Sequence, residues 1–570
     1  MSCILSSKLI SRENQLLDTK FSSLKVSNPQ ESIDYLIITT ESFKNILQPL
    51  ARWKAQKGLA SKIEVISDID IKYPAATRAE SIKNCIKYYY ENNNTQWVLL
   101  AGDQNHIPSK YEYCQDNFPW DGNVVSCDSY YSDIDNNGLF DYNAEVYVGR
   151  LTANNGVEME SLVQRILNYE VNPPIGSWMS HAIFAGSILQ FDQDWNNDSI
   201  VDYGECDGNR VNNYFKNLLP DNWTSIFLAQ TEGIKGTDNY SDVQLNYNNL
   251  RYAIDDGCSI GIINAHGAPQ SMGIDEWIID YDGDMLFDYT ADPYLEGGTP
   301  IDVSVRTSLI DTSYASLKPE DDKLGLFYLA SCSTGTFDDP DDCLSEYFLK
   351  NAAIGCVAAS YVAWGEDQWY EREHGGWFTE GLGFRFWEQI FQYNQPGKAL
   401  ALAKADYVAD RINSSEPNDY PEWEDKTLKQ YNLLGDPEVP IWLSIPKQLN
   451  ISDITAQNSS STLLNLQITA DNDPIQGVTL TYTKDQNIIW KGQTNENGTI
   501  EIPISQIDID GNILTASKIG FLPYQENIPQ DQDMSSIAGY DSFGISFIIL
   551  SFICISSVYF RFILSKRKTS

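Results

Sequence analysis

A histidine and a cysteine each stand at the end of a short apolar run, and the two residues are 66 positions apart. His266 follows residues 259–265, Cys332 follows residues 324–331, and neither run contains a charged residue. Short uncharged runs of this kind are typical of buried strands in a parallel sheet. The carboxyl ends of neighbouring parallel strands meet at one crevice. The pattern therefore predicts that the thiol and the imidazole lie close together, as a nucleophile and its base do.

Each of these residues alone has a simpler interpretation. A lone cysteine at a strand end is usually a small buried hydrophobic residue, and a lone His-Gly pair is usually a turn. The chain has only four histidines, so three rival bases exist. His106 stands in a turn, His181 begins an apolar run, and His374, in an Arg-Glu-His-Gly-Gly segment, is the strongest rival.

Four further segments occur in order with these two residues. They are residues 97–103 (Trp-Val-Leu-Leu-Ala-Gly-Asp), 145–151 (Glu-Val-Tyr-Val-Gly-Arg-Leu), 343–346 (Cys-Leu-Ser-Glu) and 432–437 (Asn-Leu-Leu-Gly-Asp-Pro). Together with His266-Gly267 and Cys332, they resemble the gingipain family of caspase-like cysteine peptidases, from about residue 34 to about residue 443. The resemblance implies a caspase-like α/β fold and protein or peptide substrates.

The resemblance also implies roles for individual residues. Cys332 is expected to be the nucleophile, and His266 to support its thiolate and protonate the leaving amine. The backbone N–H groups of Gly267 and Cys332 are expected to form the oxyanion hole. Glu145 is the candidate to orient His266, although it is an equally good ligand for the adjacent acidic loop. Trp364 is the candidate wall of the S1 pocket, with a position in the core as the alternative.

Three segments share an acidic spacing that resembles the oxygen-ligand spacing of an EF-hand loop. The residues are Asp133, Asp135, Asn137 and Asp141 in the first, Asp194, Asn196, Asp198, Asp202 and Glu205 in the second, and Asp280, Asp282, Asp284 and Asp288 in the third. The second is the most complete, because Glu205 stands at position twelve. Solvated acidic turns are the alternative, but three repeats of one spacing predict structural Ca²⁺.

Length and charge limit the classes of protein to be considered. The 570 residues are too many for one core, so two to four domains are expected. A formal net charge of -40 argues against a nucleic-acid partner, because phosphates could not be neutralised in quantity. The ten cysteines show no CxxC pair, so neither a zinc ribbon nor a disulfide scaffold is indicated, and their pairing is not assigned.

Strands alternating with helices predict an α/β protein of two caspase-like subdomains with parallel-type sheets. A region of short alternating segments then predicts a small immunoglobulin-like β-sandwich. The expected organisation is residues 1–33 (N-terminal segment, a candidate propeptide remnant), 34–170 (first subdomain), 171–445 (catalytic subdomain), 446–528 (sandwich), 529–542 (linker), 543–563 (transmembrane helix) and 564–570 (basic tail).

The carboxyl-terminal region predicts a membrane anchor. Residues 543–560 carry no charge and are followed by Arg561 and by the basic residues 566–568. An apolar run of this length can span a bilayer, and the basic cluster belongs on the cytoplasmic side. The first residues lack the apolar region of a secretory signal. Either the natural start lies upstream or the tail itself directs insertion, so that the catalytic part is outside the cell.

The leading hypothesis is therefore a membrane-anchored, extracellular, calcium-supported cysteine endopeptidase. A sortase-like transpeptidase, which passes the acyl group to an amine instead of water, uses the same chemistry. An inactive calcium-binding surface adhesin is the hypothesis from another class, and the intact His266 and Cys332 argue against it.

Overall fold

The computed structural model describes residues 32–114, 122–135, 142–194, 200–201, 204–237, 242–287, 302–313, 317–365, 376–414, 421–453, 463–503 and 512–528. The predicted linker, membrane helix and basic tail lie outside these residues, as does nearly all of the N-terminal segment. Within the described ranges, none of the helices is both long and apolar enough to cross a membrane. The predicted anchor at 543–563 therefore stays a prediction.

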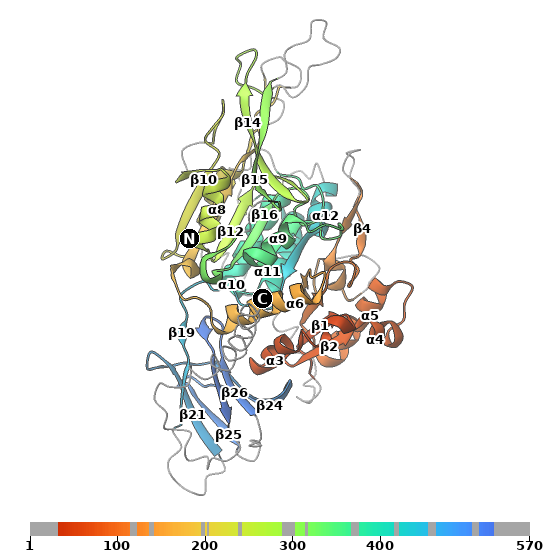
Figure 1. Cartoon of the computed structure of the whole chain (residues 1–570), viewed down its shortest axis with the longest axis vertical. Helices are drawn as coiled ribbons and strands as arrows, with labels where there is room; N and C mark the ends of the chain where they lie inside the picture. Colours follow the sequence, from red (N-terminus) through yellow and green to blue (C-terminus); the bar gives the residue numbers. More distant parts are fainter. Residues whose placement is uncertain are drawn as a thin grey trace, which may run out of the picture.

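One large sheet of eleven strands forms the centre of the described part of the chain (Figure 1). Its strands, in spatial order, are β11 (Val243–Gln244), β10 (Thr224–Ala229), β7 (His181–Gly186), β12 (Ile260–Asn264), β16 (Gly325–Ala330), β17 (Ala353–Ala359), β18 (Tyr431–Gly435), β6 (Tyr147–Leu151), β3 (Trp97–Ala101), β1 (Tyr35–Thr39) and β2 (Ser61–Val65). The expected α/β class with a mostly parallel sheet is thus confirmed.

The junction at β18 differs from the expectation of two subdomains with separate parallel sheets. β18 pairs in the parallel sense with β6 but in the antiparallel sense with β17. The two halves therefore run in opposite directions within one continuous sheet. All five residues of β18 are buried, so this strand can pair on both sides and join the halves into one sheet.

Helices cover both faces of the sheet because successive residues of each strand point to opposite faces. In β12, Ile260 and Ile262 enter one core cluster, whereas Ile263 enters the other. The first face carries α2 (Glu41–Lys44), α3 (Gln48–Gln56), α6 (Gly156–Val171), α7 (Gly208–Lys216), α10 (Phe378–Tyr393), α11 (Pro396–Asn413) and α12 (Pro421–Gln430). The second carries α4 (Ile66–Lys72), α5 (Arg78–Asn93), α8 (Tyr247–Asp256) and α9 (Leu344–Asn351).

Smaller sheets project from this core. Strands β13 (His266–Ala268), β14 (Ser271–Ile279) and β15 (Val303–Asp311) form a three-stranded antiparallel sheet, and its β14–β15 hairpin extends beyond the central sheet (Figure 1). The other two small sheets are β4 (Tyr111–Tyr113) with β5 (Val124–Ser126), and β8 (Ile188–Gln190) with β9 (Cys206–Asp207). The first small sheet matters most for the site, because it begins at His266.

A β-sandwich follows the central sheet, at the opposite end from the β14–β15 hairpin (Figure 1). One sheet holds β20 (Asn450–Asp453), β21 (Leu463–Ala470), β22 (Asp473–Pro474) and β25 (Thr499–Pro503); the other holds β23 (Thr479–Lys484), β24 (Asn487–Gln493), β26 (Asn512–Ser517) and β28 (Tyr524–Ile528). The short strands β19 (Lys447–Gln448) and β27 (Phe521–Leu522) pair separately. Side chains from both sheets fill one core. Its relation to immunoglobulin domains stays a prediction.

The sandwich caps the carboxyl end of α3. The last carbonyl groups of a helix have no partner within the helix. Here the Gln56 carbonyl accepts from the Thr481 hydroxyl, the Lys57 carbonyl from Ser517 Oγ at 3.1 Å, and the Gly58 carbonyl from Lys491 Nζ at 2.6 Å. The sandwich is thus bonded to the first half of the sheet and is not a freely hinged module.

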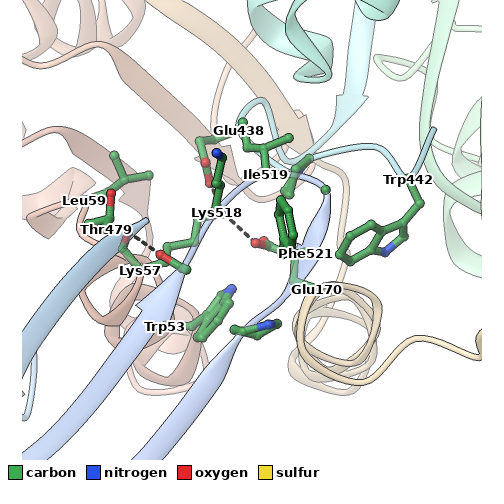
Figure 2. A pocket seen from close by; sticks show the side chains of 14 residues that line it. Trp53, Lys57, Leu59, Glu170, Glu438, Trp442, Thr479, Lys518, Ile519 and Phe521 are labelled. Atoms are coloured by element: carbon green, nitrogen blue, oxygen red, sulfur yellow. Dashed lines mark hydrogen bonds and ion pairs between the residues drawn. The ribbon is translucent and has the colours of Figure 1, made fainter. Parts of the chain in front are cut away.

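A cluster of buried charges lies beside this junction. Lys54 Nζ is 2.9 Å from Glu170, 2.7 Å from Asp436 and 2.8 Å from Glu438, and its side chain is fully buried. Lys57 Nζ contacts both Glu170 and Glu438 at its edge. Next to the cluster is a cavity of about 150 Å³, walled by Trp53, Trp442 and Phe521 among others (Figure 2). Neither His266 nor Cys332 lines this cavity.

Candidate active site

The strand register brings His266 and Cys332 to one place. β12 and β16 pair in parallel, with Asn264 opposite Ala330 at their carboxyl ends. His266 and Cys332 each follow two residues later, so the two segments that carry them leave the sheet at the same edge. The roles of the two residues as nucleophile and base stay a prediction.

Gly267 allows the two segments to approach closely. A Cβ atom on Gly267 would lie 2.3 Å from the carbonyl oxygen of Cys332 and 3.0 Å from the Ser331 side chain. No residue with a side chain fits in that space, since contacts under 3.0 Å force the backbone to move. The N–H of Gly267 thus lies in the same segment that touches the Cys332 backbone, where an oxyanion hole would have to form.

A tight turn presents the Cys332 side chain. Ser333, the next residue, has φ +55°, in the left-handed region that side chains rarely adopt. Its N–H donates to the Tyr361 carbonyl at 2.8 Å, which holds the turn in place. Beyond it, Cys332 Sγ is 3.3 Å from the Ala363 carbonyl and accepts from the Ala363 N–H at 3.5 Å. The sulfur donates to that carbonyl and accepts from that N–H, so both contacts hold it against the Ala363 backbone.

Cys332 is also the most accessible thiol in the described part of the chain. The seven other described cysteines are buried, whereas Cys332 is partly exposed. Burial raises the pKa of the Cys127 thiol to about 12, and raises the pKa of Cys258 and of Cys356 as well. These thiols stay protonated and do not compete as nucleophiles.

The acid beside His266 is Asp275, on β14, and sequence reasoning missed it. His266 Nε2 lies 3.5 Å from Asp275 Oδ2. Arg306, on β15, holds the same carboxylate with Nε and Nη2 at 2.5 and 2.6 Å. Burial lowers the pKa of His266, Arg306 lowers it further, and Asp275 opposes both. The two acids of residues 271–279 are adjacent, so the sequence does not show which of them faces His266. The partner of His266 depends on how that strand pairs.

Glu145 lies elsewhere. It precedes β6, and β16, β17 and β18 stand between β6 and the strand that leads to His266. Strands about 4.8 Å apart place those two strands roughly 19 Å from each other. One Glu145 carboxylate oxygen accepts from the Ile134 N–H at 2.7 Å. The structure brings Asp275 and not Glu145 to His266, so a role of Glu145 in orienting the imidazole stays a prediction without a supporting contact.

Trp364 directly follows Ala363, whose carbonyl and N–H both contact the Cys332 sulfur. Its ring stacks on Trp423 with centroids 4.3 Å apart and planes 11° from parallel, and both rings pack against the main core. Trp364 is therefore close to the thiol in the chain and is also part of a packed aromatic pair. The position of Trp364 next to Ala363 agrees with a pocket wall, and its packing against Trp423 agrees equally well with a core residue.

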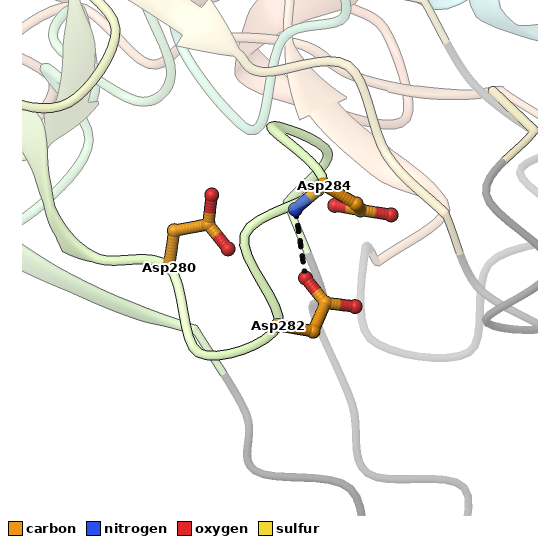
Figure 3. Close-up of side chains that lie close together, drawn as sticks. All are labelled: Asp280, Asp282 and Asp284. Carbon is orange, nitrogen blue, oxygen red and sulfur yellow. Dashed lines mark hydrogen bonds between the residues drawn. The ribbon is translucent and has the colours of Figure 1, made fainter.

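The third acidic loop has the geometry closest to a cation site. One carboxylate oxygen from each of Asp280, Asp282 and Asp284 lies within 4.8 Å of the others (Figure 3). Burial raises the pKa of Asp282, and the neighbouring acids Asp284 and Asp280 raise it too. Asp288 lies outside the described residues.

The other two acidic loops are only partly described. Asn137, Asp141, Asn196, Asp198 and Asp202 lie outside the described residues. Asp133, on the described side, is 3.4 Å from Lys83 Nζ, and Asp135 is two residues further on.

The second of these loops already has cations at its twelfth position. The Glu205 carboxylate is 2.8 Å from Lys235 Nζ and 3.3 Å from Arg210, while Asp194 is buried nearby in the chain. Lys235 and Arg210 therefore neutralise Glu205, the residue whose position twelve made this loop the most complete of the three in sequence. The geometry favours the Asp280 loop over it.

The sequence pattern of peptidase family C25 matches residues 28–442, which is most of the chain. The chain belongs to peptidase family C25. Gingipain R2 of Porphyromonas gingivalis is 23% identical over 241 residues, which cover 42% of this chain and 28% of that protein. Lys-gingipain of the same species is 23% identical over 519 residues, covering 86% of this chain and 25% of that protein. This C25 chain thus spans about a quarter of the length of these relatives.

Solved structures share the fold. The crystal structure of the Arg-specific cysteine proteinase gingipain R (RGPB) matches with a TM-score of 0.61 at 16% identity, covering 88% of this chain and 100% of that one. A complex of the pro- and mature domains of RgpB from P. gingivalis matches with a TM-score of 0.59 at 15% identity, covering 87% and 99%. The predicted membership of the gingipain-type cysteine peptidases is confirmed.

Proposed function

We propose that this C25 chain is a cysteine endopeptidase in which Cys332 attacks the peptide carbonyl and His266 transfers the protons. The observation that carries the proposal is the pairing of β12 with β16, which places both residues two positions past the strand ends. The close approach of the Gly267 backbone to the Cys332 carbonyl supports the proposal as well.

The proposed reaction has two steps. The Cys332 thiolate forms a C–S bond with the peptide carbonyl carbon, and the N–H groups of Gly267 and Cys332 stabilise the oxyanion. The C–N bond then breaks as the His266 imidazolium gives its proton to the leaving amine. In the second step water attacks the thioester and gives its proton to the imidazole. The C–S bond breaks, the carboxylic product leaves, and the thiolate–imidazolium pair is restored.

The test of this function is hydrolysis of a mixed-sequence peptide library by the purified chain, with the Cys332→Ala variant measured beside it. Internal cleavage by the native chain alone supports the proposal. Products in which the acyl part is joined to an added amine, with little hydrolysis, would favour the sortase-like transpeptidase. Equal cleavage by both proteins would contradict the role of Cys332.

We also propose that residues 543–563 anchor the peptidase in a membrane, with the catalytic part outside the cell and the basic tail 564–570 in the cytoplasm. Support comes from the uncharged run and from the basic residues that follow it. The full chain is expected to sediment with membranes and to resist carbonate extraction, whereas a chain ending at residue 542 is expected to be released. Retention of the shortened chain in the extracted membrane would contradict the anchor.

Structural calcium is a further part of the proposal, and the Asp280 loop is its best candidate because three carboxylate oxygens converge there. Repulsion among these oxygens falls when a cation binds. Millimolar Ca²⁺ is therefore expected to raise the melting temperature above that in excess chelator, and Asp282→Asn to reduce the difference. Glu276→Gln, a charge change in the preceding strand, is the control and should keep it. Equal melting temperatures with chelator and with Ca²⁺ would contradict the site.

A further inference from the structure

The β14–β15 hairpin carries two charged residues, Asp275 and Arg306, close to His266. His266 pairs with Gly273 across β13 and β14, and Asp275 pairs with Arg306 across β14 and β15. Gly273 and Asp275 lie on one face of β14, since strand residues alternate. Gly273 has no side chain, and a Cβ there would lie 3.3 Å from Arg306 Cδ and 2.9 Å from a backbone oxygen. The glycine therefore leaves room for the imidazole and the guanidinium to meet at Asp275.

Arg306 fixes the orientation of the Asp275 carboxylate independently of the imidazole. The two parallel contacts at 2.5 and 2.6 Å form a bidentate pair, which allows little rotation of the carboxylate. Burial alone would raise the pKa of Asp275, but the hydrogen bonds from Arg306 outweigh burial and hold the pKa below its usual range. The carboxylate is therefore ionised and oriented next to His266 Nε2, at 3.5 Å. Catalytic contacts of this length often shorten when substrate binds.

We propose that Asp275 is a positioning residue, which holds the His266 imidazole by Nε2 so that Nδ1 exchanges protons with the Cys332 thiol and the leaving amine, and that Arg306 holds Asp275 for this task. The inference rests on the proposed peptidase function and names a residue of the same site. Among the described residues, the charged groups that act on the imidazole are Asp275 from β14 and Arg306 from β15.

Asp275 raises the pKa of the His266 imidazole and Arg306 lowers it. Opposite shifts of this pKa in variants of the two residues are a result that a purely structural ion pair would not give. In the Cys332→Ala background the coupling to the thiol is absent, and the four histidines of the chain can be titrated by NMR after ¹³C labelling of their rings. Asp275→Asn is expected to lower the pKa of His266, and Arg306→Gln to raise it, each by roughly half a unit to one unit. His181, which contacts Thr224 at 2.8 Å, is the internal reference.

Activity gives the second readout. With Cys332 intact, Asp275→Asn is expected to lower kcat on the order of tenfold or more while KM changes little. Asp275→Glu, which keeps the charge, should recover part of the loss. Glu276→Gln is the matched control, because the next residue of β14 points to the opposite face. Opposite pKa shifts of His266 in Asp275→Asn and Arg306→Gln, with a kcat loss in Asp275→Asn and none in Glu276→Gln, support the inference.

The inference is overturned if the His266 pKa is the same in all variants, or if Asp275→Asn and Glu276→Gln have equal kcat values. The NMR titration uses a chain without the nucleophile, so it tests the contact even if no peptide is cleaved. Absence of hydrolysis by the native chain, together with the two opposite shifts, would count against the proposed function and leave the positioning of the imidazole supported.

Discussion

Replacement of Cys332 by alanine is expected to abolish peptide hydrolysis, with a loss of roughly 10⁴-fold or more in kcat/KM. The reason is that every described cysteine except Cys332 is buried, so no other thiol in the described ranges is accessible enough to form the acyl-enzyme. The fold should persist, because alanine fits the same turn and removes only one partly exposed atom. The measurement is kcat/KM on peptides, with circular dichroism as the check on folding.

Two further variants make this result specific. Cys356→Ala removes a buried thiol of β17 and is expected to lower the stability slightly. At temperatures where this variant stays folded, its kcat/KM should equal that of the native chain. His266→Ala should lower turnover by roughly 10²- to 10⁴-fold, because the proton transfers are lost while the thiol remains. An electrophilic acyloxymethyl ketone should still label Cys332 slowly in that variant. Full activity of Cys332→Ala, or a loss in Cys356→Ala as large as that in Cys332→Ala, would contradict the assignment.

The common sheet edge of the His266 and Cys332 segments could be predicted from the sequence because its signal is local. Uncharged runs before His266 and Cys332 indicate buried strands, and parallel strands bring their carboxyl ends together whatever the rest of the chain does. The need for a small residue at Gly267 follows from the same crowding. Local signals also sufficed for the α/β class, the mostly parallel sheet and the β-sandwich.

Asp275 and the place of β18 could not be predicted, because both depend on pairing between distant segments. Asp275 reaches His266 only through the register of β13 with β14, and the β14–β15 ladder shifts its register next to Gly273. Nothing in the composition of 271–279 fixes that shift. β18 is as apolar as its neighbours, so its sequence indicates burial but not a position between β17 and β6.

The buried charge cluster was likewise absent from the sequence reasoning, and Lys54→Met is expected to cost about 3–5 kcal/mol of unfolding free energy. Lys54 is fully buried and contacts Glu170, Asp436 and Glu438, so its removal leaves three buried carboxyl groups without their shared cation. Denaturant unfolding at neutral pH measures the loss. Lys44→Met is the control, because Lys44 has only an exposed contact of 3.8 Å with Glu41 and should change stability little.

The loss of unfolding free energy in Lys54→Met should also depend on pH, and the pKa shifts of the buried carboxyl groups decide the direction of that dependence. Burial would raise the pKa of Glu170, but Lys54 and Lys57 outweigh burial and lower the pKa to about 2. A folded pKa below the unfolded value of about 4.3 means that Glu170 stabilises the fold fully above roughly pH 5 and loses this effect as the pH falls towards 2. For Glu438, burial raises the pKa despite the same cations. Its contribution has the opposite sign, being present at low pH and lost as the pH rises through the folded pKa.

In Lys54→Met both carboxyl groups lose their main counter-charge, and protonation is the remaining way to relieve them. The difference in unfolding free energy between the native chain and Lys54→Met should therefore be largest at neutral pH and shrink between about pH 5 and pH 3. Unfolding curves for both proteins at pH 7, 5 and 4 would measure this trend, with Lys44→Met showing no such change. A difference that is the same at all three pH values would mean that Lys54 does not hold the Glu170 carboxyl group ionised.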